Sequence, residues 1–182
     1  MEKKLKSTDI YKGKVIHVTE DEVQIENGTT SIRECVHANG GVAILAFIEH
    51  KLLFVKQYRY VVDAPTIEIP AGKIEIGEAL SVCALRELEE ETGYGAKKIE
   101  KVISFYSTPG FCNEELHIFL AHDLYKLQHP KAMDDDECIE VLLIDPKEAY
   151  QMIKEGVIKD SKTIIAIQHV LLEGWKGEEN AG

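Results

Sequence analysis

The sequence predicts an α/β fold in which strands come first, one acidic helix follows, and further strands and two helices complete the chain. Residues 41–49 and 52–60 are apolar and rich in β-branched and aromatic side chains, which indicates two buried strands. Residues 161–173 carry apolar side chains at helical spacing and are followed by Gly174, a typical helix end. The 182 residues, 45% of them hydrophobic, suit one domain with a sizeable core and a small appendage.

The first strands form the predicted appendage. Residues 14–25 and 30–37 are predicted strands, with turns at Glu20-Asp21 and at Asn27-Gly28. The Asn-Gly pair is a strong hairpin signal because both residues accept the positive φ that a tight turn requires. An isolated hairpin is marginal in water, so these strands are expected to need a partner.

Two helices are predicted near the C-terminal end. Residues 146–155 begin after Asp145-Pro146, a favourable combination of N-cap and first helical residue. Ser161 is the predicted N-cap of the last helix. The remaining predicted strands are short and cover residues 66–69, 102–106, 116–121 and 139–143.

Charge and composition exclude several classes of protein. The net charge of -11 disfavours nucleic-acid binding. No apolar run approaches the roughly 20 residues that span a bilayer, and the N-terminus lacks the apolar stretch of a signal peptide. We therefore expect a cytoplasmic protein that binds neither nucleic acid nor a membrane. The four cysteines form no CxxC pair, which indicates reduced thiols and no zinc or redox motif.

Three glutamates of the acidic helix indicate a metal ion. Glu87, Glu90 and Glu91 each follow an apolar residue by seven positions, so they continue the core-facing stripe of the helix. Carboxylates three or four residues apart repel one another, whereas a divalent cation binds such oxygens. The alternative is a solvated surface helix, because Glu is a good helix former. The stripe and the flanking Gly77 and Gly93 favour the metal site.

The segment from Gly72 to Tyr94 resembles the Nudix box, G-x5-E-x7-R-E-U-x-E-E-x-G-U, in which U is aliphatic. Tyr94 is the one departure, and it does not affect the metal-binding acids. A pattern with this many fixed positions is far more specific than a short glycine motif. The residues that match the fixed positions are Gly72, Glu78, Arg86, Glu87, Leu88, Glu90, Glu91 and Gly93.

Further segments resemble the ADP-ribose pyrophosphatase branch of the Nudix family. They are residues 33–34, 57–60, 67–72, 107–110 and the acidic run 134–140. The resemblance implies an α/β/α sandwich, with a mixed sheet between helices and an N-terminal antiparallel strand appendage. It also implies a homodimer that exchanges its N-terminal strands. Residues 1–38 would then serve dimerisation, and residues 39–182 would form the catalytic domain.

The resemblance implies a set of metal ligands. Mg²⁺, with Mn²⁺ as an alternative, would be held by Glu87, Glu91 and Glu90 and by the carbonyl oxygen of Ala71. Arg86 is expected to brace a box carboxylate through a bidentate pair. The alternative for Arg86 is an ordinary surface ion pair.

A general base must reach the attacking water, and the acidic loop at residues 128–137 offers candidates. Glu137 is the first choice and Asp135 the second. The planar guanidinium group of arginine matches the oxygens of a phosphate. An aromatic side chain is expected to stack on adenine, and Tyr11 is the candidate, although its alternative role is ordinary packing. The substrate-binding residues implied by the resemblance are Arg33, Arg59, Glu114, Pro109 and Tyr11.

The sequence therefore predicts Mg²⁺-dependent hydrolysis of the pyrophosphate bond of ADP-ribose to AMP and ribose 5-phosphate. Bound metal ions neutralise the charge of a pyrophosphate and lower the pKa of a bound water. One alternative is a hydrolase of another nucleoside diphosphate sugar, and a second is a non-catalytic ligand-sensing Nudix module. The intact box acids and the acidic net charge argue against the sensor.

Overall fold

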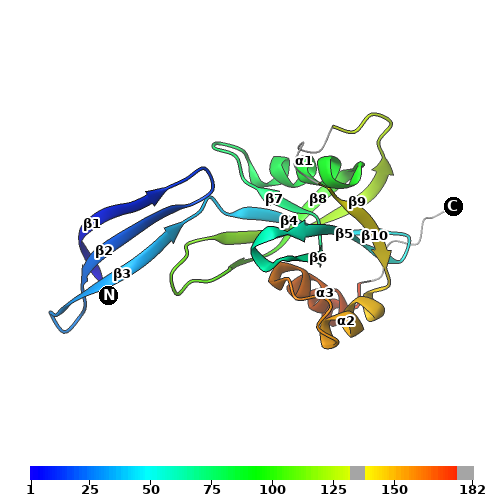
Figure 1. Ribbon diagram of the computed structural model, residues 1–182. Helices are drawn as coiled ribbons and strands as arrows, with labels where there is room; N and C mark the ends of the chain where they lie inside the picture. The colour runs from blue at the N-terminus through cyan, green and yellow to red at the C-terminus, as the bar shows by residue number, and fades with distance from the viewer. Residues whose placement is uncertain (132–137, 176–182) are drawn as a thin grey trace. The chain divides into compact units, whose positions relative to one another are not determined.

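The computed structural model describes residues 1–131 and 138–175 and divides into two units (Figure 1). Unit 1 comprises Met1–Gly40 and Phe105–Leu116, and unit 2 comprises Gly41–Ser104 and His117–Gly182. Among the described residues, unit 1 contains strands, whereas unit 2 combines a sheet with the α-helices α1, α2 and α3. The predicted α/β class and the predicted N-terminal antiparallel sheet are both confirmed.

Unit 1 is built on an antiparallel sheet in the order β1-β2-β3. β2 and β3 pair without a break, from His17 opposite His37 to Gln24 opposite Thr30. The predicted Asn27-Gly28 turn joins them, and Gly28 adopts the positive φ of 85° that the turn requires. The strands are β1 (Lys3–Lys12), β2 (His17–Gln24) and β3 (Thr30–His37).

In unit 1 one strand was not predicted and one predicted turn is absent. The strand β1 was not predicted, because all ten of its residues are exposed and give no alternating pattern. The predicted turn at Glu20-Asp21 is absent, since both residues lie inside β2. Asp21 is buried there and binds the hydroxyl of Ser7 and the ammonium of Lys4, so β1 supplies the polar partners that allow an acid in the strand.

The loop between β8 and β9 also belongs to unit 1. It runs beside β3, where Val36 N donates to Phe111 O (2.7 Å) and Asn113 N donates to Val36 O (3.2 Å). A parallel bridge joins Val36 to Cys112. The segment that contains Pro109 is thereby attached to the N-terminal sheet.

Unit 2 contains a sheet in the order β10-β5-β4-β9-β8, with β6 paired to β5 and β7 paired to β4. β10 pairs antiparallel with β5, and a hairpin through the short 3₁₀ helix at Tyr60–Val62 joins β5 to β6. The strands are β4 (Gly41–Ile48), β5 (Lys51–Arg59), β6 (Ala64–Glu68), β7 (Ala71–Lys73), β8 (Tyr94–Tyr106), β9 (Glu115–Lys126) and β10 (Glu140–Ile144).

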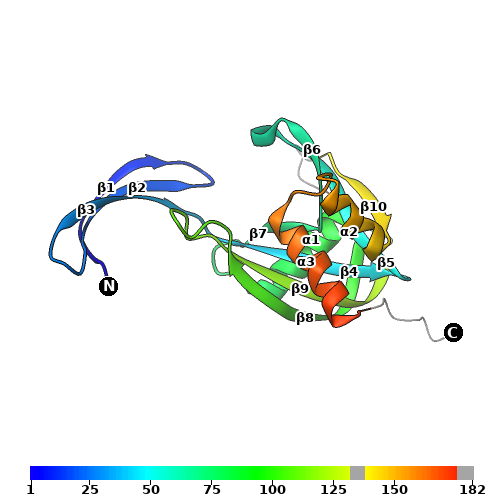
Figure 2. The ribbon, with the colours of Figure 1, turned by 90° about the horizontal axis from the view of Figure 1, so that it is seen from below.

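Helices cover both faces of this sheet (Figures 1 and 2). α1 (Leu80–Thr92) lies on one face, and α2 (Pro146–Lys154) and α3 (Ser161–Glu173) lie together on the other. α1 ends at Gly93, which has the left-handed φ of 70° expected for a C-cap. In the part of the chain that is described, no helix is long and apolar enough to cross a membrane.

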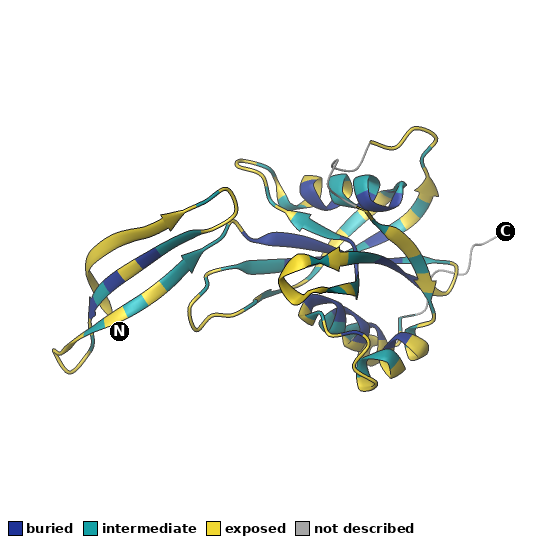
Figure 3. Ribbon diagram, in the orientation of Figure 1, coloured by how far each residue is buried: buried dark blue, intermediate teal, exposed yellow. Residues whose placement is uncertain are grey.

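The core of unit 2 forms where the sheet meets its helices. β4 is buried along most of its length, and Figure 3 shows it as the darkest strand. Its apolar side chains meet α1 through Cys83, Ala84 and Leu88, all fully buried. This packing fixes which face of α1 turns inward and thereby places the acids of the box.

Several element bounds differ from the sequence prediction. β8 and β9 are much longer than predicted, because their outer residues mix charged, small and apolar side chains without a clear strand pattern. β8 ends the order of the sheet, where lysines disfavour pairing with another chain. α2 begins after Asp145 as predicted, but α3 is capped by Asp160, whose carboxylate accepts from Thr163 N (3.0 Å), and not by Ser161.

Candidate active site

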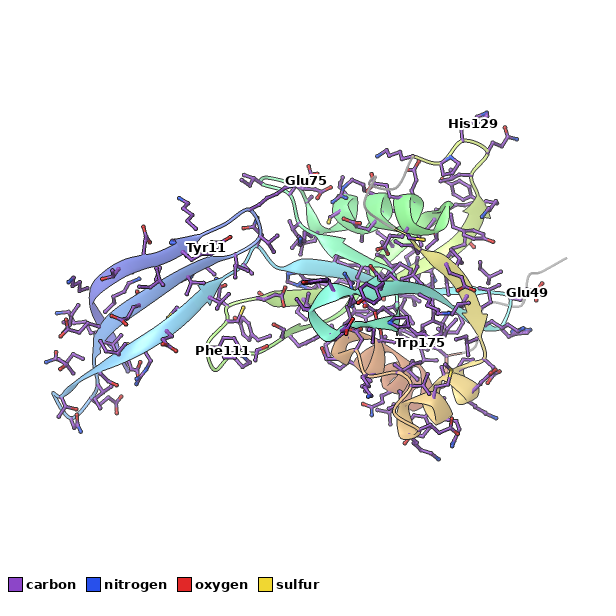
Figure 4. All side chains as sticks on the ribbon, in the orientation of Figure 1. Tyr11, Glu49, Glu75, Phe111, His129 and Trp175 are labelled. Carbon is purple, nitrogen blue, oxygen red and sulfur yellow. The ribbon has the colours of Figure 1, made fainter. Side chains whose placement is uncertain are left out.

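The turn before α1 brings the backbone of β7 close to Glu87, the first glutamate after Arg86 in the box. Gly72 lies in β7, and a Cβ atom built on it would stand 1.9 Å from Cδ of Glu87. Only a residue without a side chain leaves room for this carboxylate. Glu75, labelled in Figure 4, lies in the loop that leads from β7 to α1. The glycine therefore allows Glu87 to approach the β7 backbone.

Glu91 reaches the same strand. Its side chain is buried, with the residue 5% exposed, and Oε2 accepts a hydrogen bond from Ala71 N (2.9 Å). The carboxylate thus lies beside Ala71, whose carbonyl oxygen is the fourth predicted ligand. A buried carboxylate is stable only when hydrogen-bond donors or cations compensate it, and the amide of Ala71 is one such donor.

Arg86 lies at the centre of the box acids. Its Nε and Nη2 bind the two oxygens of Glu78 at 2.9 and 3.0 Å. Its Nη1 binds Glu87 at 2.6 Å and Glu90 at 3.0 Å, and Nη2 also donates to Lys73 O at 3.2 Å. The hydrogen bonds from Arg86 lower the pKa of Glu78 to about 2, and Glu78 in turn raises the pKa of Arg86.

Cys83 lies under this network. Its Sγ donates to Lys73 O (3.3 Å), and Arg86 Nη2 approaches the sulfur at 3.3 Å. Burial raises the pKa of the thiol to about 12, and the neighbouring Glu78 adds to the effect. The thiol therefore packs as a small apolar group and is not reactive.

The donor set of the box fits a hard divalent cation. One arginine faces three carboxylates, and a fourth, Glu91, lies on the β7 backbone. Carboxylate and carbonyl oxygens are the ligands that Mg²⁺ prefers. Within residues 1–131 and 138–175, no group of three or more acids, histidines or cysteines converges in metal-binding geometry. Glu87 and Glu90 bind Arg86 instead, and Glu91 binds the amide of Ala71.

A second charged network lies at the end of the β5–β6 hairpin. Arg59 binds both oxygens of Glu68, with Nε to Oε1 and Nη2 to Oε2 at 2.8 Å each. Thr66 donates to Oε1 at 2.6 Å, and the buried Lys162 of α3 donates to Oε2. Burial alone would raise the pKa of Glu68, but Arg59, Lys162 and Thr66 together lower it to about 2.

Arg59, predicted to bind substrate, lies near the box. The negative charge of Glu91 contributes to the raised pKa of Arg59, after the larger effect of the Glu68 hydrogen bonds. The Arg59 side chain is 41% exposed, whereas that of Glu68 is 4% exposed. The guanidinium is therefore fixed on one edge and still open to a ligand.

Unit 1 contains a cavity of about 480 Å³ that brings together Arg33 and Pro109, two predicted substrate residues. Arg33 is held there by Glu2, with Nη2 to Oε1 at 2.6 Å and Nε to Oε2 at 3.1 Å. Further lining residues are His37, Tyr106, Phe111 and Asn113. Phe111, labelled in Figure 4, lies in the loop between β8 and β9.

Tyr11 and Glu114, two further predicted substrate residues, are not among the residues that line this cavity. Tyr11 is 58% exposed on β1, and its ring folds back over Gly13, where a Cβ would stand 2.6 Å from the ring. Glu114 lies at the end of the same loop, where its carbonyl oxygen accepts from Ser107 N (3.1 Å). Asp135 and Glu137, the candidate general bases, fall outside the described residues.

Sequence reasoning named residues 67–72 as a segment that resembles the branch but gave Glu68 no role, and it missed Lys162. The sequence does contain an indication of both residues, because each is a charged residue at a position where the pattern of its element predicts an apolar side chain. Glu68 ends the short strand β6 and stands between Ile67 and Ile69 in the sequence, and Lys162 lies in the apolar helix α3. The contact itself could not be predicted, because the two residues are 94 positions apart in sequence.

The comparison with protein-family models identifies the class. A NUDIX domain matches residues 38–166, which is more than half of the chain and includes the complete box. The chain belongs to the Nudix family. A solved structure described as an ADP compounds hydrolase has the same fold, with a TM-score of 0.83 over 95% of both chains at 19% identity. The predicted α/β/α architecture is thereby confirmed.

Three curated relatives cover most of the chain. An ADP-ribose pyrophosphatase from Bacillus subtilis is 43% identical over 173 residues, 94% of each chain. A methanol dehydrogenase activator from Bacillus methanolicus is 44% identical over the same share of both chains. A GDP-mannose pyrophosphatase from Cronobacter sakazakii is 34% identical over 152 residues, 78% of each chain.

Proposed function

We propose that this protein is a metal-dependent ADP-ribose pyrophosphatase, which cleaves ADP-ribose to AMP and ribose 5-phosphate. The observation that carries the proposal is the 43% identity to an ADP-ribose pyrophosphatase along 94% of both chains. The box around Arg86 is intact and contributes a surplus of carboxylates, which supports catalysis and disfavours a ligand sensor. We also propose a cytoplasmic location.

The carboxylates of Glu87, Glu90 and Glu91 and the carbonyl of Ala71 would hold Mg²⁺, or Mn²⁺ in its place. The bound cation supplies charge neutralisation for the pyrophosphate and a lowered pKa for a bound water. Arg86 holds the carboxylates of Glu87 and Glu90 in place through hydrogen bonds of 2.6 and 3.0 Å. Gly72 leaves the space that the Glu87 carboxylate occupies.

The substrate would be oriented by arginine forks. Arg59 offers the N–H groups that Glu68 does not bind, and Arg33 faces the cavity of unit 1 together with Pro109. Glu114 and Tyr11 remain proposed contacts, and Tyr11 would have to leave Gly13 to stack on adenine. We propose Glu137, or else Asp135, as the general base.

A homodimer with exchanged N-terminal strands fits the exposure of unit 1, in which Leu5, Ile10, Ile16 and Ile32 are exposed. Residues 1–38 would then serve dimerisation and residues 39–182 catalysis. Light scattering tests the assembly. A monomer at micromolar concentration that hydrolyses ADP-ribose with full affinity would contradict it.

A panel of substrates with Mg²⁺ tests the proposed activity. ADP-ribose, GDP-mannose and other nucleoside diphosphate sugars are incubated with the purified chain, and the products are separated by chromatography. We expect ADP-ribose to give the highest kcat/KM, the products to be AMP and ribose 5-phosphate, and EDTA to abolish turnover. Preference for GDP-mannose would favour the second candidate, which the 34% identical GDP-mannose pyrophosphatase supports.

The relative from Bacillus methanolicus provides a further arm of this test. That protein is named as an activator of methanol dehydrogenase and is as similar to this chain as the pyrophosphatase from Bacillus subtilis. The chain is therefore added to an assay of methanol dehydrogenase activity. Stimulation without any turnover of ADP-ribose would replace the proposed function.

A further inference from the structure

The first turn of α3 contains a lysine in an unfavourable place. Lys162 is the second residue after the N-cap Asp160, where the positive end of the helix dipole disfavours a cation. Its side chain is only 9% exposed, so the ammonium has also lost most of its water. Two carboxylates compensate it, Glu68 Oε2 and Asp160 Oδ1, the second at 3.0 Å. Such a lysine needs a reason beyond helix stability.

The attachment of α3 to the sheet includes contacts that do not involve this ammonium. Asp160 caps the helix by accepting from Thr163 N (3.0 Å) and Thr163 Oγ1 (2.6 Å). Thr163 Oγ1 in turn accepts from Ile69 N (2.9 Å), next to the end of β6. These neutral and capping contacts already dock the helix onto the strand segment, so they leave the role of Lys162 unexplained.

Glu68 connects Lys162 to Arg59. Each Glu68 oxygen accepts two hydrogen bonds: Oε1 from Arg59 and Thr66, and Oε2 from Arg59 and Lys162. A carboxylate held at both oxygens by donors other than Arg59 cannot rotate about its terminal torsion. Thr66 and Lys162 therefore fix the plane of the carboxylate, and this plane sets the orientation of the guanidinium bound to it.

The contact with Glu68 occupies only part of the hydrogen-bonding capacity of the Arg59 guanidinium. Glu68 takes Nε and Nη2, and among residues 1–131 and 138–175 no group accepts a hydrogen bond from Nη1. The guanidinium is 41% exposed and lies in the field of the box residue Glu91. A planar fork fixed on one edge suits a phosphate oxygen on the other.

We propose that Lys162 is a positioning residue for substrate binding: through Glu68 it fixes Arg59 so that the remaining N–H groups of the guanidinium bind the diphosphate of the substrate. The inference rests on the proposed function, since it requires a diphosphate ligand. It assigns α3, on the face of the sheet opposite the box helix, a part in substrate affinity.

The experiment compares KM, kcat and thermal stability in Lys162→Met and in Lys159→Met, a matched change of an exposed lysine just before the same helix. We expect KM for ADP-ribose to rise about tenfold in Lys162→Met, while kcat stays within about threefold of the wild-type value. The reason is that the lost interaction stabilises the bound substrate and the transition state equally. Lys159→Met should leave both unchanged. An unchanged KM in folded Lys162→Met overturns the inference.

A double-mutant cycle separates positioning from general damage to the fold. In an Arg59→Gln background, Lys162→Met should change KM by less than about twofold, because the group on which it acts is gone. A tenfold effect that persists in this background overturns the inference. If Lys162→Met does not fold, Lys162→Gln replaces it, since the amide still donates to Glu68 without a charge. A rise in KM of less than tenfold in Lys162→Gln supports the inference, and an unchanged KM contradicts it.

The outcome can be told apart from failure of the proposed function. Turnover of ADP-ribose with a KM independent of Lys162 leaves the function and removes the inference. If the wild-type chain turns over no nucleoside diphosphate compound, the function is wrong, and the Kd for ADP-ribose is measured by calorimetry in EDTA. A Kd weakened by Lys162→Met then supports the inference, whereas an equal Kd or no binding overturns it.

Discussion

The two charged networks of unit 2 differ in composition. At the box, one cation, Arg86, is shared by Glu78, Glu87 and Glu90, which leaves a surplus of negative charge. At the β5–β6 hairpin, Glu68 is shared by Arg59 and Lys162, and Asp160 also binds Lys162, so carboxylates and cations are equal in number and one edge of the Arg59 guanidinium is unused by the described residues.

The contrast indicates which ligand each network lacks. A cluster in which carboxylates outnumber cations gains free energy from a further cation, and a cluster with an unused guanidinium edge gains it from an anion. Glu91 connects the two, since its carboxylate lies on the β7 backbone and its charge also acts on Arg59. A metal–diphosphate substrate carries both missing charges, and the two networks together suit it better than either does alone.

The largest expected effect is at the box. Glu91→Gln should lower kcat by about 10³-fold, because a bound metal contributes several kcal/mol to the transition state. The fold should survive, since the change removes like-charge repulsion along α1 and keeps the shape of the side chain. Steady-state kinetics at limiting Mg²⁺ measures the loss, with the exposed Glu75→Gln as the control. Near-normal turnover of Glu91→Gln would show that Glu91 is no ligand.

The second prediction concerns stability at the other network. Glu68 has its pKa lowered from 4.5 to about 2 in the folded chain, so it contributes stability that is present above pH 4.5 and lost as the pH falls towards 2. Glu68→Gln should therefore lower the free energy of unfolding at pH 7 by roughly 3 kcal/mol. The difference from the wild type should shrink below pH 4.5.

Urea unfolding at several pH values measures this difference. The exposed Glu173→Gln at the far end of α3 is the control, and it should not destabilise the protein, because a negative charge at a helix C-terminus is unfavourable. A difference that stays constant between pH 7 and pH 3 would show that the charge of Glu68 is not what stabilises the network.

The third prediction uses the close approach at β7. Gly72→Ala places a Cβ 1.9 Å from Cδ of Glu87, so the carboxylate must move away from the strand. We expect the Mg²⁺ concentration for half-maximal activity to rise about tenfold, the usual size of an effect on ligand orientation. Titration of activity with Mg²⁺ measures it. If the requirement for Mg²⁺ does not change, Glu87 does not bind the metal from its present position.

The contrast between the networks also explains which parts of the site the sequence could predict. The box acids lie within one helical turn, so helical periodicity alone places Glu87 and Glu91 on one face, and the structure leaves them 13% or less exposed. The contact of Glu68 with Lys162 depends on how β6 and α3 meet, 94 residues apart. No local pattern contains that information.

The fold shows the same division. Strands with an apolar face, such as β4, were predicted nearly to their ends because burial leaves a pattern in the sequence. β1 has no buried residue, and it forms because β2 offers it hydrogen-bond partners and because Ser7 and Lys4 bind the buried Asp21. Elements stabilised by neighbours and not by their own apolar residues were the ones the sequence did not reveal.

The smallest expected effect is a change in Tm on ligand binding. We expect Mg²⁺ to stabilise the protein through the box and ADP-ribose to stabilise it through the network around Glu68. At about ten times its Kd, Mg²⁺ should raise the Tm of the wild type by about 4 °C, since a stabilisation of about 1.4 kcal/mol shifts the Tm of a chain of this size by that amount. Arg59→Gln should keep this shift and lose the shift caused by ADP-ribose in EDTA. Glu91→Gln should show the reverse. Scanning calorimetry measures all four shifts, and loss of both shifts in either variant would mean that the two networks act as one site.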